Sequence, residues 1–192
     1  MMEAIQVHHP ERIVVVGIPG AGKTTWVKRY IDAWIKKHGY RVLIVDVLGE
    51  YDTPGTIYRP VNRTEPREEI ELLVENALIN PYLRKDKKLY GLVVFDEGSR
   101  YILPRTTLGA YFGYINDFSR HMDLTMIVVA RRYSQIHTDM AELAHRHVIF
   151  RQTGVNDLRR LAELKHDLDT EVLKLRGHEH VEYMNGEIKR YK

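Results

Sequence analysis

One eight-residue segment constrains the fold of this chain more than any other part of its sequence. Residues 17–24 are Gly-Ile-Pro-Gly-Ala-Gly-Lys-Thr, which matches the phosphate-binding pattern G-x-x-x-x-G-K-[ST] at every fixed position. The β-branched run Arg12–Val16 precedes this segment, and apolar residues at helical spacing follow it within Lys23–Lys37. A strand, a glycine-rich turn and a helix in this order are the context that the motif requires. The segment therefore predicts a P-loop.

The composition of the P-loop predicts how it binds ATP. Its glycines let backbone N–H groups approach phosphate oxygens, and the N-terminus of the following helix adds partial positive charge. We expect Lys23 to reach the β- and γ-phosphates and the Thr24 hydroxyl to bind Mg²⁺. The predicted nucleotide-binding residues are Gly17, Pro19, Gly20, Ala21, Gly22, Lys23, Thr24 and Thr25.

A second segment supplies adjacent carboxylates. The apolar run Leu92–Phe95 is followed directly by Asp96 and Glu97. A buried strand would deliver Asp96 to the Mg²⁺ shell, which is the Walker B function. Glu97 would then polarise an attacking water as the general base. The pair favours an ATPase over a small-molecule kinase, because nucleotide kinases usually lack this glutamate and carry an arginine-rich lid.

The rest of the chain alternates predicted strands and helices, which indicates a mostly parallel sheet covered on both faces. The further predicted strands are Arg41–Val47, Leu89–Phe95, Leu124–Ala130 and Arg146–Phe150. The further predicted helices are Glu69–Ile79, Leu108–His121, Asp157–Leu164 and Asp169–Leu175. Near the end, His180–Met184 and Glu187–Tyr191 flank Asn185-Gly186, a dipeptide that favours a hairpin turn. This hairpin is expected to add antiparallel strands at one edge of the sheet.

Length and composition limit the class of protein. The 192 residues fit one domain, so residues 1–192 are predicted to form a single ATPase domain. The chain has no cysteine, which excludes disulfides and cysteine-ligated zinc. No apolar run is long enough to span a bilayer, and residues 1–10 lack the apolar core of a signal peptide. We therefore expect a cytoplasmic protein. The net charge of +3 permits nucleic-acid binding without indicating it.

Two later segments resemble the FtsK–HerA superfamily of ATPases. Asp46–Tyr51 (Asp-Val-Leu-Gly-Glu-Tyr) resembles the D-x-x-G-E-Y stretch that follows the second strand of HerA-like ATPases. Ser119–Ala130 resembles the R-H-x-G segment and following strand of the same superfamily, with Asp123 where the glycine usually stands. Together with Asn156–Arg159 and the terminal hairpin, these segments are most similar to genome-packaging ATPases of membrane-containing icosahedral viruses, of the archaeal turreted type.

The resemblance implies a RecA-like (ASCE) three-layer α/β/α fold and an ATP-driven translocase of double-stranded DNA. It implies a homo-oligomeric ring, a hexamer or a pentamer, and capsid or vertex proteins as further partners. A different function also fits the superfamily: a Zot-like phage assembly ATPase that does not move DNA. Candidate DNA-contacting loops are Arg84–Lys88 and Arg100–Thr107. Tyr111, Phe112 and Tyr114 offer stacking surfaces, although aromatic residues at this spacing are more typical of a core.

Arginines are the main departure from the family pattern. Family members usually have T-Q-R after the fourth strand, where the glutamine senses the γ-phosphate, whereas this chain has Ala130-Arg131-Arg132. Either Arg131 contacts the γ-phosphate directly, or it faces a neighbour or solvent and Gln135 or Arg132 is the sensor. Ring motors also insert an arginine from the adjacent protomer. Arg120, in the matched R-H segment, is the first candidate for this arginine; the next candidates are Arg132 and Arg151.

Overall fold

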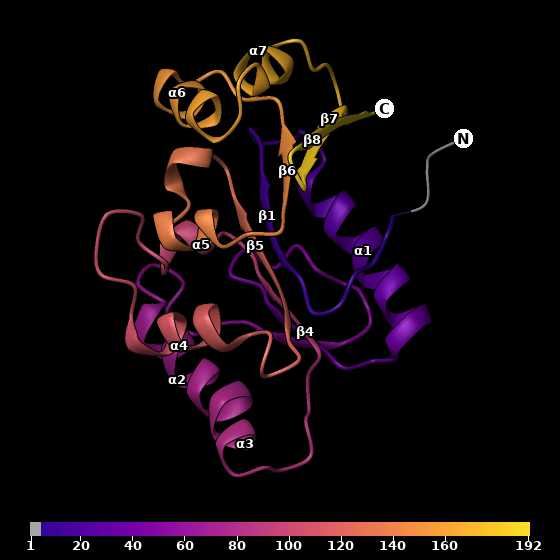
Figure 1. Ribbon diagram of the computed structural model, residues 1–192. Helices are drawn as coiled ribbons and strands as arrows, with labels where there is room; N and C mark the ends of the chain where they lie inside the picture. The colour runs from indigo at the N-terminus through magenta and orange to yellow at the C-terminus, as the bar shows by residue number, and fades with distance from the viewer. Residues whose placement is uncertain (1–4) are drawn as a thin grey trace.

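The computed structural model describes residues 5–192, which form one eight-stranded sheet with helices on both faces (Figure 1). The strand order is β3-β2-β4-β5-β1-β6-β7-β8. The strands are β1 Arg12–Val16, β2 Val42–Val45, β3 Thr56–Tyr58, β4 Leu92–Phe95, β5 Thr125–Ala130, β6 Arg146–Phe150, β7 His180–Met184 and β8 Glu187–Tyr191. Strands β1 to β6 pair in parallel, and β7 and β8 are antiparallel at one edge. The predicted α/β/α fold with a terminal edge hairpin is confirmed.

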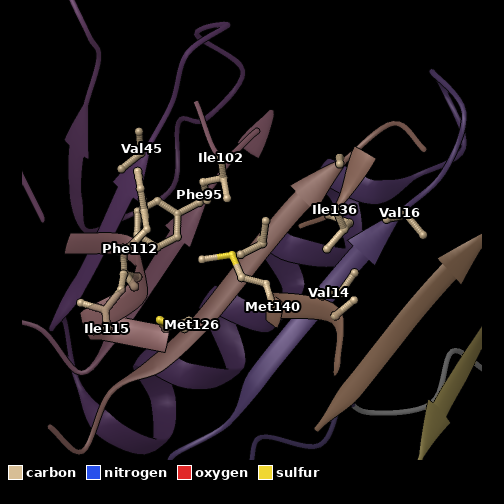
Figure 2. Packing of buried hydrophobic residues seen from close by; sticks show 14 of the residues in the cluster. Val14, Val16, Val45, Phe95, Ile102, Phe112, Ile115, Met126, Ile136 and Met140 are labelled. Atoms are coloured by element: carbon tan, nitrogen blue, oxygen red, sulfur yellow. The ribbon is translucent and has the colours of Figure 1, made fainter. Parts of the chain in front are cut away.

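The helices cover the two faces unequally. They are α1 Lys23–His38, α2 Arg67–Val74, α3 Asn80–Leu83, α4 Ala110–Phe118, α5 Thr138–Glu142, α6 Val155–Leu164 and α7 Leu168–Leu173. Helix α1 covers one face, and α2, α4 and α5 lie across the other (Figure 1). Alternation along β1 explains the two cores, because Ile13 and Val15 face α1 whereas Val14 and Val16 face the opposite side. The larger core lies on that opposite side (Figure 2).

The register of the parallel strands brings three loops together. β1 pairs with β5 and β6, and β4 pairs with the other side of β5. Because parallel strands end at the same edge, the residues that follow β1, β4 and β5 lie side by side there. These residues are the P-loop, the Asp96–Glu97 pair and Arg131.

Several element boundaries differ from the sequence prediction. The predicted helix Glu69–Ile79 begins earlier, at Arg67, and changes to a π-helix over Glu75–Ile79 before continuing as α3. The predicted strand Leu89–Phe95 begins only at Leu92, because the residues before Gly91 are largely exposed and outside the sheet. Strand β3 and helix α5 are additional elements. Phe112 is buried, which excludes the stacking alternative for this residue and confirms the favoured core interpretation.

The turn after α4 contains Asp123, the residue that departs from the R-H-x-G pattern. Helix α4 is shorter than the predicted Leu108–His121 because Gly109 is extended at its start and a turn follows Phe118. Within this turn Asp123 has φ 49°, in the left-handed region that glycine enters most readily. Aspartate is one of the few other residues that tolerate this region. Asp123 therefore adopts a backbone conformation that a glycine would also accept at this position.

Among residues 5–192, no helix combines the length and the apolar character needed to cross a membrane.

Candidate nucleotide-binding site

Close packing beneath the P-loop accounts for its first glycine. A Cβ on Gly17 would lie 2.6 Å from the Cβ of Phe150 at the end of β6, so any larger residue would displace the loop from the sheet. Gly22 has φ 106°, which side-chain-bearing residues rarely adopt, and it directly precedes α1. No side chain caps the N-terminus of this 16-residue helix. Its first amide groups therefore lack a side-chain acceptor and present positive charge to the loop.

Lys23 closes the loop on itself. Its Nζ donates hydrogen bonds to the carbonyl oxygens of Gly17 (2.8 Å) and Ile18 (3.2 Å). Burial lowers the pKa of Lys23, whereas the nearby carboxylates of Glu97 and Asp96 act in the opposite direction. The ammonium group is thus held against backbone carbonyls, directly beside the two carboxylates.

A cavity of about 360 Å³ joins the P-loop to the other two loops. It is lined by Pro19, Gly20, Gly22, Lys23, Thr24, Thr25, Leu48, Glu50, Asp96, Glu97, Arg131 and His178. The sequence-predicted residues of the P-loop, the Walker B pair and Arg131 therefore come together in one place. A larger cavity of about 680 Å³, beside the terminal hairpin, holds none of these groups.

Asp96 is buried beneath the cavity with one oxygen available. Its side chain is 3% exposed, and the Tyr51 hydroxyl donates a long hydrogen bond (3.4 Å) to Oδ1, while Oδ2 has no partner. Burial raises the pKa of Asp96 to about 7, and the negative charges of Glu97, Glu50 and Asp46 contribute to the increase. A positive charge at Oδ2 would relieve this repulsion.

Glu97 and Arg131 form an ion pair across the ends of neighbouring strands. The distance from Arg131 Nε to Glu97 Oε1 is 3.0 Å. Glu97 itself has a left-handed backbone (φ 47°, ψ 40°), which turns the chain sharply after β4. On the other side, the side-chain amide of Gln152 donates to the backbone carbonyl of Arg131 (3.1 Å) and anchors that residue's main chain.

Glu50 belongs to the site but was not predicted as a site residue. The Thr24 hydroxyl donates a hydrogen bond to Glu50 Oε2 at 2.9 Å. The loop that carries Glu50 is held by Asp46, which is fully buried and accepts from the amides of Gly49, Glu50 and Tyr51. The sequence offered one signal, since Glu50 follows the predicted strand Arg41–Val47 within the D-x-x-G-E-Y stretch. The structure supplies the rest, because β2 pairs with β4 and its end meets the same edge of the sheet.

The other predicted arginines lie outside the cavity. Arg120 is exposed. Burial lowers the pKa of Arg12 and of His145, and the charge of Arg120 contributes to both shifts, so Arg120 lies near these two groups. Arg12 begins β1 and His145 precedes β6, so Arg120 is at the edge of the sheet opposite the P-loop. Arg132 and Arg151 are exposed, and the Arg151 carbonyl accepts from the amide of Ile18 (3.4 Å). Within this one chain, only Arg131 among these arginines reaches the cavity.

A phosphate loop on a central strand and an Asp–Glu pair at the same edge of a parallel sheet define the class of this protein as a P-loop ATPase. More specifically, it belongs to the family described as Helicase HerA, central domain, whose model matches residues 10–190. The chain is therefore an ATPase of the FtsK–HerA type. This result agrees with the resemblance of Asp46–Tyr51 and Ser119–Ala130 to that superfamily.

Solved structures of viral ATPases have the same fold over almost the whole chain. The DNA-packaging ATPase B204 of Sulfolobus turreted icosahedral virus has a TM-score of 0.80 at 16% identity, with 96% of this chain and 98% of that chain covered. The genome packaging NTPase B204 of Sulfolobus turreted icosahedral virus 2, in complex with AMPPCP, has a TM-score of 0.79 at 15% identity, with 95% and 97% covered.

A curated relative matches a shorter segment. A probable thymidylate kinase of Archaeoglobus fulgidus is 37% identical over 68 residues, which is 35% of this chain and 34% of that protein. The chain thus spans about a third of the length of this relative.

Proposed function

We propose that this chain is an ATP-driven translocase of double-stranded DNA that packages a viral genome and works as a homo-oligomeric ring. The observation that carries the proposal is the convergence of Lys23, Asp96, Glu97 and Arg131 around one cavity. Membership of the HerA central-domain family supports it, as does the match in fold to B204, a DNA-packaging ATPase.

The chain's own groups suit a nucleotide with Mg²⁺. The first amides of α1 and the Lys23 ammonium would bind the phosphates, which would replace the loop carbonyls as acceptors for Lys23. Thr24 donates its proton to Glu50 and so keeps its oxygen lone pairs for a cation, and Asp96 Oδ2 has no other partner. No three His, Cys, Asp or Glu side chains converge as a metal site among residues 5–192. Thr24 and Asp96 would therefore hold Mg²⁺ together with phosphate oxygens, and the ion would neutralise phosphate charge.

Glu97 is the group suited to activate water. Its carboxylate lines the cavity one residue beyond Asp96. Strand β4, which precedes both residues, is separated from the P-loop strand β1 by β5. As a water oxygen bonds to the γ-phosphorus, Glu97 would accept the water proton. The bond from the γ-phosphorus to the bridging oxygen breaks, and ADP leaves with that electron pair. The products are ADP and inorganic phosphate.

A loop that starts at the catalytic pair is our candidate for contact with DNA. Arg100–Thr107 follows Glu97 after a single 3₁₀ turn, and Arg100 and Arg105 are exposed on it. The Tyr101 hydroxyl donates to the Asp96 carbonyl (2.9 Å), so this loop is tied to the nucleotide site. The alternative loop, Arg84–Lys88, precedes β4 and lies at the opposite edge of the sheet. The connection to Asp96 favours the first loop.

The test of this function is ATP turnover with and without duplex DNA. Glu97→Gln protein is the control, because it is expected to turn over slowly under both conditions. Turnover that rises with duplex length supports a translocase, because a motor that engages DNA hydrolyses ATP as it moves. Turnover that does not respond to DNA in an assembled ring would overturn the translocase and favour a morphogenesis ATPase. Transfer of the phosphate to thymidylate instead of water would identify a kinase.

A trans-acting role for Arg120 is expected to show in mixtures of two variants. Arg120→Ala should lower turnover about tenfold or more while leaving ATP affinity within a few-fold, because the lost contact forms mainly in the transition state. Mixed with Glu97→Gln protein, it should regain activity that neither variant has alone. The regained activity arises at interfaces that pair an intact Glu97 with an intact Arg120 of the neighbour.

The trans-acting role of Arg120 has one control and one outcome that would contradict it. Recovery should increase with protein concentration, since it requires assembly. If mixed rings form, as labelled subunits would show, and no activity returns, then Arg120 is not the trans arginine, and Arg132 and Arg151 are to be tested in the same way.

A further inference from the structure

The ion pair between Arg131 and Glu97 occupies the group that hydrolysis needs. Glu97 Oε1 accepts a hydrogen bond from Arg131 Nε at 3.0 Å. This contact uses one acceptor site of the carboxylate and fixes its orientation toward Arg131, so the carboxylate is not free to turn toward a water molecule. The Glu97 side chain is 11% exposed, whereas that of Arg131 is 44% exposed. The arginine is therefore the partner with room to move.

The same arginine lies where the terminal phosphate would arrive. Lys23 is the expected partner of the β- and γ-phosphates. Burial lowers its pKa, and the charges of Glu97 and Arg131 also act on that pKa, so the three groups are close neighbours. All three line the cavity. The Arg131 main chain is anchored through Gln152, so only its side chain needs to turn for a new contact.

A phosphate competes well with a carboxylate for a guanidinium group. A terminal phosphate carries more negative charge than a carboxylate, and its oxygens match the planar fork of arginine for paired hydrogen bonds. Nε and the two terminal nitrogens present five N–H donors, of which the contact to Glu97 uses one. A glutamine at this position, as in the family pattern, would carry no charge and could not form an ion pair with Glu97.

From this geometry we propose that Arg131 exchanges partners: it holds Glu97 in the absence of ATP and moves to the γ-phosphate when ATP binds, which frees Glu97 to activate water. The exchange rests on ATP being the substrate of this site. ADP has no γ-phosphate, so with ADP bound the ion pair persists. The site thereby distinguishes ATP from ADP and withholds its base until the third phosphate is present.

The preference for ATP over ADP provides the first test. The ratio of the two dissociation constants, for ADP and for a non-hydrolysable ATP analogue, is measured by calorimetry at constant Mg²⁺. Arg131→Gln is expected to lower this preference about tenfold, because a charge-assisted contact to the γ-phosphate is lost. Arg131→Lys should retain a larger part of it. The matched control is Arg159→Gln, an exposed arginine on α6 outside the cavity, which should leave the ratio unchanged.

The second test follows the arginine itself. In an NMR spectrum of arginine Nε–H groups, the Arg131 signal should shift when the ATP analogue is added and stay in place with ADP. In Glu97→Gln protein this signal should already be shifted without nucleotide, because the charged partner is gone. The Glu97→Gln shift assigns the signal, whereas a response to the analogue and not to ADP is not expected from an arginine that only supports the structure. Thermal unfolding of each variant verifies that it is folded.

The outcomes separate this inference from the proposed function. If folded Arg131→Gln keeps the wild-type preference, or if the Arg131 signal responds equally to ADP and to the analogue, the exchange is wrong even though the protein hydrolyses ATP. If the wild-type protein binds neither nucleotide, the nucleotide site itself is wrong, and the exchange is overturned with it.

Discussion

Replacement of Lys23 by alanine is expected to reduce ATP affinity by about 10²-fold or more and to abolish measurable turnover. The ammonium group is held beside Glu97 and Asp96, and these two carboxylates would face the phosphates without a compensating charge once it is removed. Truncation of one partner of a buried charge pair commonly has an effect of this size. Calorimetric titration with ATP and Mg²⁺ measures the affinity, and phosphate release measures the turnover.

The control for this variant lies on the same helix. Lys36→Ala removes an exposed lysine from the last turn of α1 and should leave binding unchanged. The Lys23→Ala protein should remain folded, because, of the two hydrogen bonds that it loses, the one to the Ile18 carbonyl is exposed to water and the one to the Gly17 carbonyl is only partly buried. Near-normal hydrolysis by folded Lys23→Ala protein would show that the nucleotide site lies elsewhere.

Glu97→Gln is expected to bind ATP with Mg²⁺ and yet to turn over about 10²–10⁴-fold more slowly. The amide has the shape of the carboxylate but cannot accept the water proton, and loss of a general base has effects of this size. Because its side-chain oxygen can still accept a hydrogen bond from Arg131, the local structure should be preserved. Single-turnover phosphate release with saturating protein isolates the chemical step from binding.

An exposed glutamate provides the comparison. Glu187→Gln on the edge strand β8 removes the same charge far from the cavity and should keep wild-type turnover. If Glu97→Gln loses nucleotide binding but keeps its rate per bound nucleotide, then Glu97 is a ligand and not the base.

The parts of the site that could be predicted from sequence are those whose residues are adjacent in the chain. Gly17–Thr24 carries its own strand and helix, and Leu92–Glu97 places two carboxylates directly after an apolar run. Each segment therefore indicates both its secondary structure and its chemistry without reference to any other part of the chain. The parallel sheet followed from the alternation of strands and helices, since crossovers of this kind require parallel pairing.

The parts that could not be predicted depend on contacts between distant segments. The hydrogen bond from Thr24 to Glu50 and the ion pair from Arg131 to Glu97 span 26 and 34 residues. They follow only from the strand order, which the sequence does not specify. Strand β3 has three partly exposed residues after Pro54-Gly55, too few to show an alternation. The π-helix has the same apolar spacing as the α-helix that it interrupts, so composition does not reveal it.

The left-handed backbone of Glu97 sets thermal stability and catalysis against each other at one position. A side-chain-bearing residue in this conformation costs about 1–2 kcal/mol, a cost that glycine avoids and asparagine reduces. Either residue would remove the carboxylate. A search for variants that only resist heat would therefore favour chains that have lost the proposed base, whereas a search for turnover would keep the strained glutamate. Selection for turnover and selection for stability are therefore expected to leave different residues at this position: glutamate under the first, and glycine or asparagine under the second.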